Sequence, residues 1–369
     1  MTYTYGLKVQ TVSIRTKVNA ETQLQNAKNA GMTTLDVNMH EGGAHYNTTL
    51  FPRCTSIETG FDPLGYIIQR GHELGISIFV WFCPGAYYGY FPQWDMYGKH
   101  TNCPKHWLDF SVLAARQKMA EAISDIYAHY TPDGISLDYI RYTDADKTAT
   151  TPAWWPAMAE GLSVNDITNT VELVKAAIAG RGKLQAHVKY GNWLDQFQDW
   201  PNWLKNNLLD QAMPMMYADP NNAVLDGHSI ASWITRFLDP LNIDKNRIWP
   251  CLAFMNMSVT PNVAKTITQF NLEVKDAKNA GYFNQQYFDN KTLTTEFINY
   301  LKEENKMPVK NDLIVVADTI DAEVVVLTNK IAELTTLIAG FKVQTDKIRT
   351  LSAQLTQADT MADELAVLL

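Results

Sequence analysis

The sequence predicts a (β/α)8 barrel, an α/β fold, followed by a C-terminal α-helical coiled coil. Up to about residue 305, short β-rich runs alternate with amphipathic helical stretches, and after residue 307 a seven-residue apolar repeat replaces that alternation. Eight strands that alternate with helices over roughly 300 residues are typical of a closed parallel barrel. A doubly wound sheet is the main rival, and it is disfavoured because no glycine-rich phosphate loop follows any strand. We therefore expect a barrel domain over residues 1–306 and a coiled-coil oligomerisation segment over residues 307–369.

The strands are recognised as short β-rich runs, and the helices as longer stretches with apolar residues at helical spacing. The expected strands span residues 7–14, 33–39, 76–82, 134–138, 184–190, 211–217, 247–254 and 281–288. The expected helices span residues 20–30, 64–74, 112–130, 167–179, 200–207, 230–238, 263–279 and 292–305. The last of these helices completes the barrel pattern.

The segment after residue 307 carries two interleaved apolar rows. The first row has a residue every seven positions: Leu313, Ile320, Leu327, Leu334, Phe341, Ile348, Leu355, Ala362 and Leu369. The second row lies four positions after the first, at Val324, Ile331 and Ile338, and decays to Thr345, Ser352 and Asp359. Two apolar rows predict a coiled coil, looser in its C-terminal half, and so a homo-oligomer (dimer or trimer) through residues 313–369. The alternative is a single amphipathic helix that packs back on the barrel.

The bulk composition narrows the classes of function. The net charge of −8 and the pI of about 5.5 argue against nucleic-acid binding, because a phosphate backbone requires a basic face. No apolar run is long enough to span a membrane, and no apolar stretch follows a basic start as in a secretory signal peptide. The 10 Trp and 17 Tyr residues suit stacking on sugar rings, although aromatic residues also fill large barrels.

No metal or cofactor is expected. The sequence has four widely spaced cysteines without a C-x-x-C pair: Cys54, Cys83, Cys103 and Cys251. His40 and His45 lie near Glu41 in a glycine-rich loop, but two histidines five positions apart do not have a recognised zinc spacing.

The segment from Asp133 to Tyr142 reads DGISLDYIRY and carries the sharpest chemical signal. Its GISL run predicts a short buried strand, which places Asp138 at the strand end that opens onto the active-site face of a barrel. Arg141 would hold an ionised Asp138 and lower its pKa, which suits a nucleophile or an electrostatic stabiliser. The alternative is a structural Asp–Arg pair at the end of a strand.

The same segment resembles the D-G-I-H-L-D-Y-I-R-Y signature of the GHL10-type (DUF187-like) glycoside hydrolase barrels, which are similar to the hydrolase domain of bacterial exopolysaccharide deacetylase/hydrolases. Further blocks resemble this family in the same order: NAGMTTL at 29–35, AHY at 44–46, TLFP at 49–52, FDPL at 61–64, GISIFVWF at 75–82, HWLD at 106–109, QDWPNW at 198–203 and MPMMY at 213–217. The resemblance covers about residues 5–300 and implies a barrel that cleaves a polysaccharide internally.

The sequence departs from the family at two places on the rim of the predicted barrel. The loop after the second strand, which usually starts with an arginine and a Gly-Asp pair, reads MHEGG at 39–43. The last strand, which usually ends in a Phe-Ser-Tyr-like run, reads YFNQQY at 282–287. These changes predict altered specificity or loss of catalysis.

Glycoside hydrolysis normally uses two carboxyl groups that flank the bond. Asp138 is expected to be the first, as nucleophile or stabilising base. Asp219, just after the sixth strand, is a candidate general acid, and Glu41 after the second strand is the alternative. Asp36 is expected to face the barrel interior, where a buried carboxylate would need a partner such as Lys189 or Arg141.

Several further side chains near strand ends are expected to contact sugar. Lys189 would sit beside Asp138 and orient sugar hydroxyls or lower the pKa of Asp138, unless it forms a structural ion pair. The expected substrate-binding residues are Asp36, Tyr46, Trp81, Tyr139, Arg141, Lys189, Trp193 and Tyr217. Each aromatic residue alone is more often a packing residue, and the group together favours carbohydrate.

These patterns predict a glycoside hydrolase that cleaves a bacterial surface polysaccharide. The alternative is a non-catalytic carbohydrate-binding or structural protein, favoured by the altered loops and by the avidity that an oligomer gains from several weak sites. The coiled coil without a signal peptide suggests a phage virion component, such as a fibre, spike or decoration protein in contact with other virion proteins. A cytoplasmic enzyme is the other expectation.

Overall fold

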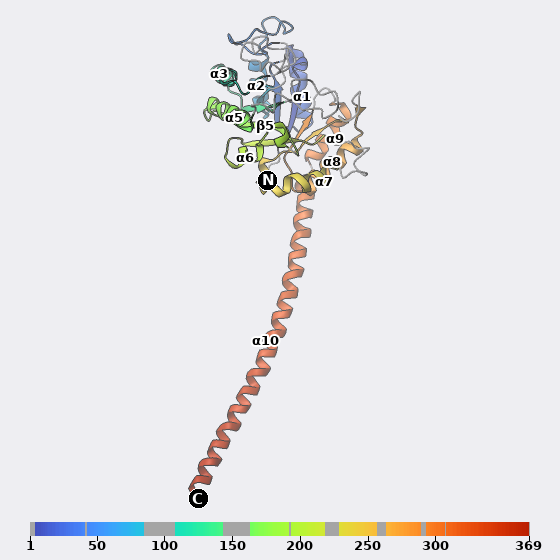
Figure 1. Cartoon of the computed structure of the whole chain (residues 1–369). Helices are drawn as coiled ribbons and strands as arrows, with labels where there is room; N and C mark the ends of the chain where they lie inside the picture. Colours follow the sequence, from blue (N-terminus) through green and yellow to red (C-terminus); the bar gives the residue numbers. More distant parts are fainter. Residues whose placement is uncertain are drawn as a thin grey trace, which may run out of the picture. The chain divides into compact units, whose positions relative to one another are not determined.

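The computed structural model describes residues 4–40, 43–84, 108–142, 163–191, 193–217, 229–256, 263–288, 293–306 and 308–368. The chain divides into two compact units, Met1–Lys306 and Met307–Leu369. The first unit holds the strands and most of the helices, and the second is one long helix (Figure 1).

The first unit is a closed barrel of eight parallel strands. Around the barrel the order is β1-β10-β7-β6-β5-β4-β3-β2, and it closes because β1 pairs with both β2 and β10. The strands are β1 (Tyr5–Val9), β2 (Thr34–Asn38), β3 (Ser77–Phe82), β4 (Gly134–Leu137), β5 (Lys183–Lys189), β6 (Gln211–Met215), β7 (Cys251–Ala253) and β10 (Gln285–Phe288). The predicted (β/α)8 barrel is therefore confirmed.

Helices cover the outside of this barrel (Figure 1). They are α1 (Lys17–Asn29), α2 (Pro63–Glu73), α3 (Leu113–His129), α5 (Val164–Ile178), α6 (Trp200–Lys205), α7 (Ile230–Trp233), α8 (Ile267–Asn279) and α9 (Thr295–Lys306). Side-chain caps fix several of their starts; Ser163 and Thr266 each form a capping box with the residue three positions later. The main hydrophobic core contains one side of the strands, including Leu7 and Leu35, together with the apolar faces of these helices.

Several boundaries differ from the sequence-based expectation. β1 ends at Val9, and a 3-10 turn over Thr11–Ile14 replaces the rest of the expected strand. The helix expected from residue 263 starts at Ile267, because Val263–Ala264 forms a strand, β9, that pairs with β8 (Met255–Asn256) in an antiparallel ribbon.

The expected helix over 230–238 is also irregular. It consists of the short α7 and a π-helix over Ile234–Leu238, followed by a 3-10 turn at Asp239–Leu241. Pro240 occupies the start of that last turn, where it removes a backbone donor and so ends regular helix.

The second unit is α10 (Pro308–Leu368), a helix of 61 residues. Its side chains are exposed throughout residues 328–357. No helix in the described part of the chain is both long and apolar enough to cross a membrane. The C-terminal segment is helical as expected, and its assembly into a coiled coil stays a prediction.

Candidate active site

The side chains that point into the barrel form layers, each contributed by alternate strands, as is usual for this fold. The strand register places one residue from each of β1, β3, β5 and β7 in a central layer: Lys8, Trp81, His187 and Cys251. By the same register, β2, β4, β6 and β10 contribute the next layer down: Asp36, Ser136, Met213 and Gln286. Such layers are normally filled by branched apolar residues. Here the two layers contain the charged residues Lys8 and Asp36. Buried charged groups destabilise a fold unless they are paired, so their presence indicates a functional role or a loss of stability.

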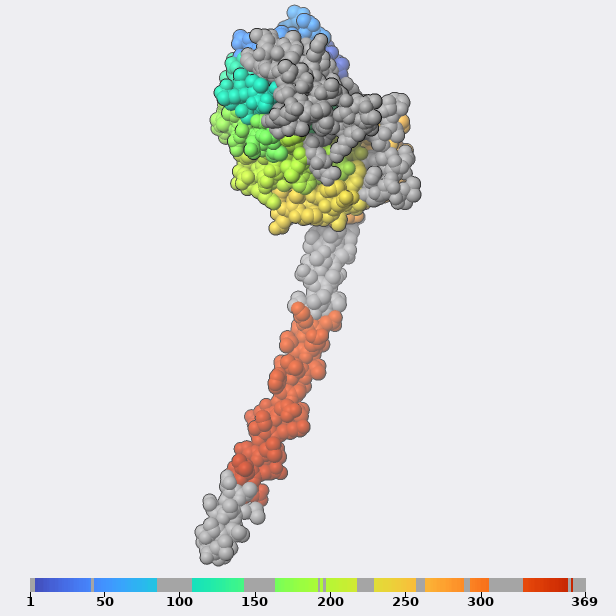
Figure 2. Space-filling view, in the orientation of Figure 1, coloured from blue at the N-terminus to red at the C-terminus, as the bar shows by residue number. Residues whose placement is uncertain are grey.

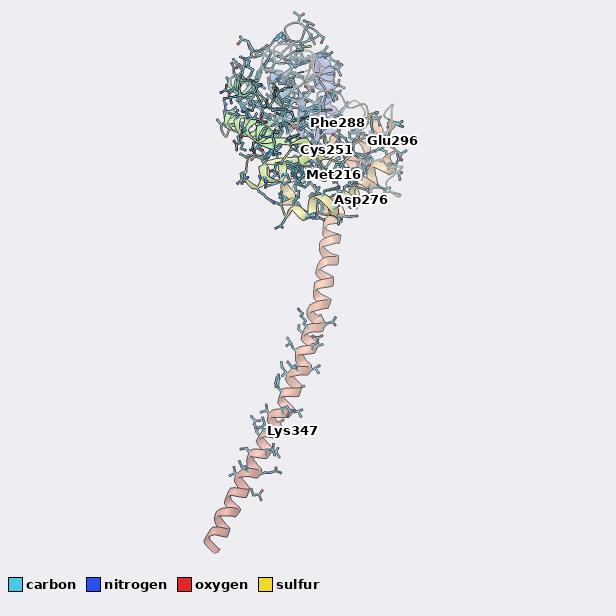
Figure 3. The ribbon with its side chains drawn as sticks, viewed as in Figure 1. Met216, Cys251, Asp276, Phe288, Glu296 and Lys347 are labelled. Carbon is cyan, nitrogen blue, oxygen red and sulfur yellow. The ribbon has the colours of Figure 1, made fainter. Side chains whose placement is uncertain are left out.

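A buried ion pair joins Lys8 to Asp138. Lys8 Nζ donates to Asp138 Oδ2 at 2.6 Å, and the two residues are 1% and 2% exposed. Because β1 and β4 are not neighbours in the barrel, this bond crosses the interior. The ammonium also lies 4.0 Å from the ring centroid of Trp81 and 4.9 Å from that of Phe288. Cys251 and Phe288, on the neighbouring strands β7 and β10, are labelled in Figure 3.

The electrostatics of this pair keep both partners charged. Burial alone would raise the pKa of Asp138, but the positive charges of Lys8, above all, and Arg141 outweigh it, and the pKa lies below its ordinary value. Burial likewise works to lower the pKa of Lys8, but the Asp138 carboxylate outweighs it and the pKa is raised. Asp138 is therefore a carboxylate at neutral pH.

The backbone after Asp138 turns sharply at the mouth of the barrel. Asp138 continues the β-ladder through its N–H, which donates to the Phe82 carbonyl at 2.8 Å. Tyr139 then adopts a left-handed conformation with φ of 51°, and its N–H donates to Asp138 Oδ1 at 2.8 Å. A non-glycine residue in this region stores about 1–3 kcal/mol of strain, which occurs most often at functional sites. The guanidinium carbon of Arg141 lies 4.8 Å from the Tyr139 ring centroid.

Asp36 lies one layer below and is fully buried. Its carboxyl accepts hydrogen bonds from Ser136 Oγ at 2.6 Å, from Gln185 Nε2 at 2.7 Å and from His187 Nε2 at 2.9 Å. Burial and the Lys8 charge lower the pKa of His187, so its ring is neutral. The single ring proton is assigned to Nε2, because the Asp36 carboxyl accepts a hydrogen bond from that nitrogen.

The expected partners of the two acidic residues need correction. Lys189 and Arg141 were expected to neutralise Asp36, yet its partners are the polar groups of β4 and β5, because Asp36 sits below the strand ends. Arg141 was expected to pair with Asp138, and it acts only as a weaker charge while Lys8 makes the ion pair. Lys189 is anchored through its backbone to Gln198 and Trp200, and its ammonium has no ion-pair partner in the described chain.

Two of the four aromatic residues expected to form a sugar platform pack against other side chains. Tyr46 is fully buried, with its hydroxyl hydrogen-bonded to His40 and its ring edge-on to Tyr130, so its ring is not available to a sugar. Trp193 is partly buried and packs edge-on to Trp200.

Trp81 and Tyr217 do belong to the site. Trp81 lies beneath Asp138 with its face toward Lys8, and its indole Nε1 has no hydrogen-bond partner among the described residues. The ring of Tyr217 stacks on that of Phe288, with the ring centroids 5.6 Å apart, and its hydroxyl oxygen lies 3.8 Å from Cys251 Sγ. Burial raises the pKa of Cys251 to about 12, so this thiol is not a nucleophile.

The two candidates for the second carboxylate, Glu41 and Asp219, lie outside the described residues. Glu41 follows His40 after β2, and Asp219 comes two positions after Tyr217 behind β6. The strands that precede them, β2 and β6, run parallel to β4 and end at the same edge of the barrel. In the described part of the chain, no group of His, Cys, Asp and Glu side chains is arranged to hold a metal ion.

Sequence reasoning missed Lys8 and His187. The signal for Lys8 was present, because a lysine between Leu7 and Val9 in a buried strand must point to the opposite face from its apolar neighbours. For His187 the same alternation along β5 places it inward with Gln185 and Lys189.

No protein-family model matches the sequence, and the search of curated proteins found no match. Among solved structures, the glycoside hydrolase domain of PgaB (BpsB) from Bordetella bronchiseptica is similar, with a TM-score of 0.57 at 10% identity over 81% of this chain and 98% of that chain. An endo-1,4-β-D-mannanase from Thermotoga petrophila has a TM-score of 0.53 at 12% identity over 83% and 99%. A glycoside hydrolase family 18 N-acetylglucosaminidase from Paenibacillus barengoltzii has 0.51 at 11% over 82% and 99%. At these identities the likeness shows the fold, a barrel of the kind found in glycoside hydrolases.

Proposed function

We propose that this protein is a glycoside hydrolase that cleaves a polysaccharide, with Asp138 as its ionised catalytic carboxylate. The observation that carries the proposal is the position of Asp138: a buried carboxylate at the C-terminal end of β4, kept charged by Lys8 and followed by a strained turn at Tyr139. In barrels of this type the catalytic groups stand at this edge.

Because Asp138 is ionised, we assign the two roles in glycoside hydrolysis to two different carboxyl groups. An ionised carboxylate serves as nucleophile, base or stabiliser of the positive charge that develops on the sugar, so the proton donor must be another group. Asp219 is the first candidate for that acid and Glu41 the second. Tyr139, Arg141, Lys189 and Tyr217 are the residues proposed to contact substrate beside Asp138.

The GHL10-type resemblance supports a bacterial surface polysaccharide as substrate. The structural likeness to the PgaB hydrolase domain supports the same class of barrel. Combined with a homo-oligomeric tail, this substrate suits a depolymerase of a phage virion that meets the polysaccharide coat of its host. Absence of the protein from purified particles of an associated phage would remove the virion part of the proposal.

The test is reducing-end release from a panel of bacterial polysaccharides by the native chain, Asp138→Asn and the control Asp346→Asn. Asp346→Asn is the same change from aspartate to asparagine, but it lies on α10, outside the barrel unit. Loss of the carboxylate should lower the rate by about 10²–10⁴-fold, and the control should act like the native chain. Equal activity of Asp138→Asn and the native chain, with both folded by near-UV circular dichroism, would show that Asp138 is not catalytic.

A second candidate, a non-catalytic carbohydrate-binding barrel, is favoured by one observation. Both oxygens of Asp138 are already engaged, Oδ2 by Lys8 and Oδ1 by the Tyr139 N–H, and the residue is 2% exposed. Those contacts also suit a structural ion pair. No release from any polymer, with polysaccharide binding retained in the native chain and in Asp138→Asn, would establish this second function.

A further inference from the structure

The long helix α10 exposes large apolar side chains along its length. Between residues 328 and 357 these are Ile331, Leu334, Leu337, Ile338, Phe341, Val343, Ile348, Leu351 and Leu355, each at least 55% exposed. Figure 2 shows the side chains of this part of the helix in red. At 1.5 Å per residue a 61-residue helix is about 90 Å long. A helix in water draws most of its stability from packing an apolar face, so this face needs a partner.

The apolar face changes side in the middle of the helix. The first row (Leu334, Phe341, Ile348, Leu355) keeps its seven-residue spacing throughout. Up to Ile338 the second row lies four positions after the first row. It does not end where Thr345 and Ser352 begin, because Leu351 continues it three positions after Ile348 of the first row.

The order of core positions then runs 331, 334, 338, 341, 344, 348, 351 and 355, and all of them are apolar except Gln344. The regular alternation of steps of three and four contains one additional step of three, between 341 and 344. Such an insertion of three residues, a stammer, overwinds a coiled coil locally without ending it. The seam therefore continues into the C-terminal half, where a looser end was expected.

We propose that α10 assembles with the α10 helices of further copies of this chain, parallel and in register, as one continuous coiled coil whose seam crosses at Phe341. The partner is a second copy because the crossing has to be matched. In a parallel in-register assembly every copy changes side at the same height, whatever the number of copies. An antiparallel pair would match only if it were centred on the crossing.

The charges of α10 support this seam. The charged residues from 333 to 355 are Glu333, Lys342, Asp346, Lys347 and Arg349, and none of them occupies a core position. Lys347 is labelled in Figure 3. Their signs are mixed, so like charges do not repel along the seam. The proposal stands apart from catalysis, since it concerns only the second compact unit.

The experiment measures the mass of the full chain in solution by sedimentation velocity at micromolar concentration. Three variants place a glutamate on α10. Leu351→Glu falls on the seam only if the seam crosses at Phe341, and Ser352→Glu falls on it only if the seam does not cross. Val343→Glu lies off both rows, at a side chain that is 55% exposed. We expect a molecular mass of two or three times 41.7 kDa for the native chain, Val343→Glu and Ser352→Glu. For Leu351→Glu we expect 41.7 kDa, or a mixture of monomer and oligomer in exchange.

Three outcomes would overturn the proposal: a monomeric native chain, dissociation by Val343→Glu as strong as by Leu351→Glu, or dissociation by Ser352→Glu alone. Orientation is tested with Leu355→Cys under an added oxidant, which takes two electrons and two protons from a pair of thiols as the S–S bond forms. A parallel assembly gives a covalent dimer beyond any seen with the native cysteines. An oligomer without this dimer would be antiparallel and would refute the parallel register.

Discussion

Replacing Lys8 by methionine tests the central feature of the barrel, the buried ion pair with Asp138. Methionine keeps most of the volume of the lysine stem and removes the charge. The Asp138 carboxylate, which is 2% exposed in the native chain, then keeps the Tyr139 N–H as its remaining hydrogen-bond donor among the described residues. Removing one partner of a buried ion pair costs about 3–5 kcal/mol, because the remaining charge is uncompensated. Lys8→Met should therefore lower the free energy of unfolding by about that amount.

Urea unfolding followed by tryptophan fluorescence measures this loss, because all 10 tryptophans precede residue 307 and report on the barrel. The double variant Lys8→Met/Asp138→Asn removes both charges and should be more stable than Lys8→Met alone. Lys118→Met is the matched control: its partner Glu121 has a side chain 53% exposed, and such a pair contributes about 0–1 kcal/mol. A cost for Lys8→Met no larger than for Lys118→Met would refute the reasoning.

Two further predictions concern the barrel. Burial lowers the pKa of His187 below 6.5 in the folded protein. As the pH falls through 6.5, the unfolded chain therefore takes up a proton at His187 before the folded protein does, and the free energy of unfolding decreases. Between about pH 7 and pH 5 the native chain should therefore lose up to about 1.4 kcal/mol per pH unit relative to His187→Gln in urea unfolding; parallel curves would contradict the assignment. Gly134→Ala should destabilise the barrel by about 1–3 kcal/mol, because the new Cβ would lie 2.4 Å from the Lys183 carbonyl oxygen and from the Phe79 ring. Gly340→Ala, with open space around its Cβ, should instead stabilise α10 by about 1 kcal/mol in thermal unfolding followed at 222 nm, and equal effects at both glycines would refute the packing argument.

The barrel could be predicted from the sequence because its signals are local. Each strand is a short run of largely buried residues, and several helices start at a side-chain cap that the sequence shows. The boundaries that failed depend on contacts made elsewhere in the chain. The short strand β9 at Val263–Ala264 exists only because Met255–Asn256 pairs with it, and the one local signal that α8 starts after it is the capping box from Thr266 to Gln269.

The carboxylate of the site, Asp138, could be predicted from the sequence, and its ion-pair partner could not. Asp138 could be found because a strand end follows directly from the GISL run. Its partner Lys8 is separated from it by 130 positions, and the bond exists only because eight strands close into a barrel with one register. Sequence reasoning chose Arg141, three positions away, and Lys189, at the end of the next strand, because proximity along the chain and the order of the strands were the only measures available. The same limit applies to Asp36, whose donors come from β4 and β5.

A polar barrel interior also carries information about function. A buried ion pair is on average no more stabilising than a well-packed apolar pair of the same volume, so stability alone does not account for Lys8 and Asp138. What the pair does provide is a carboxylate held in one position and one charge state at the mouth of the barrel, which is what charge stabilisation at a reacting sugar requires. In an active enzyme, Lys8→Met should therefore raise the pKa of Asp138 and move the acidic limb of the pH–rate profile to higher pH. An acidic limb that stays in place while activity persists would show that Lys8 serves the fold and that a different group carries the charge in the reaction.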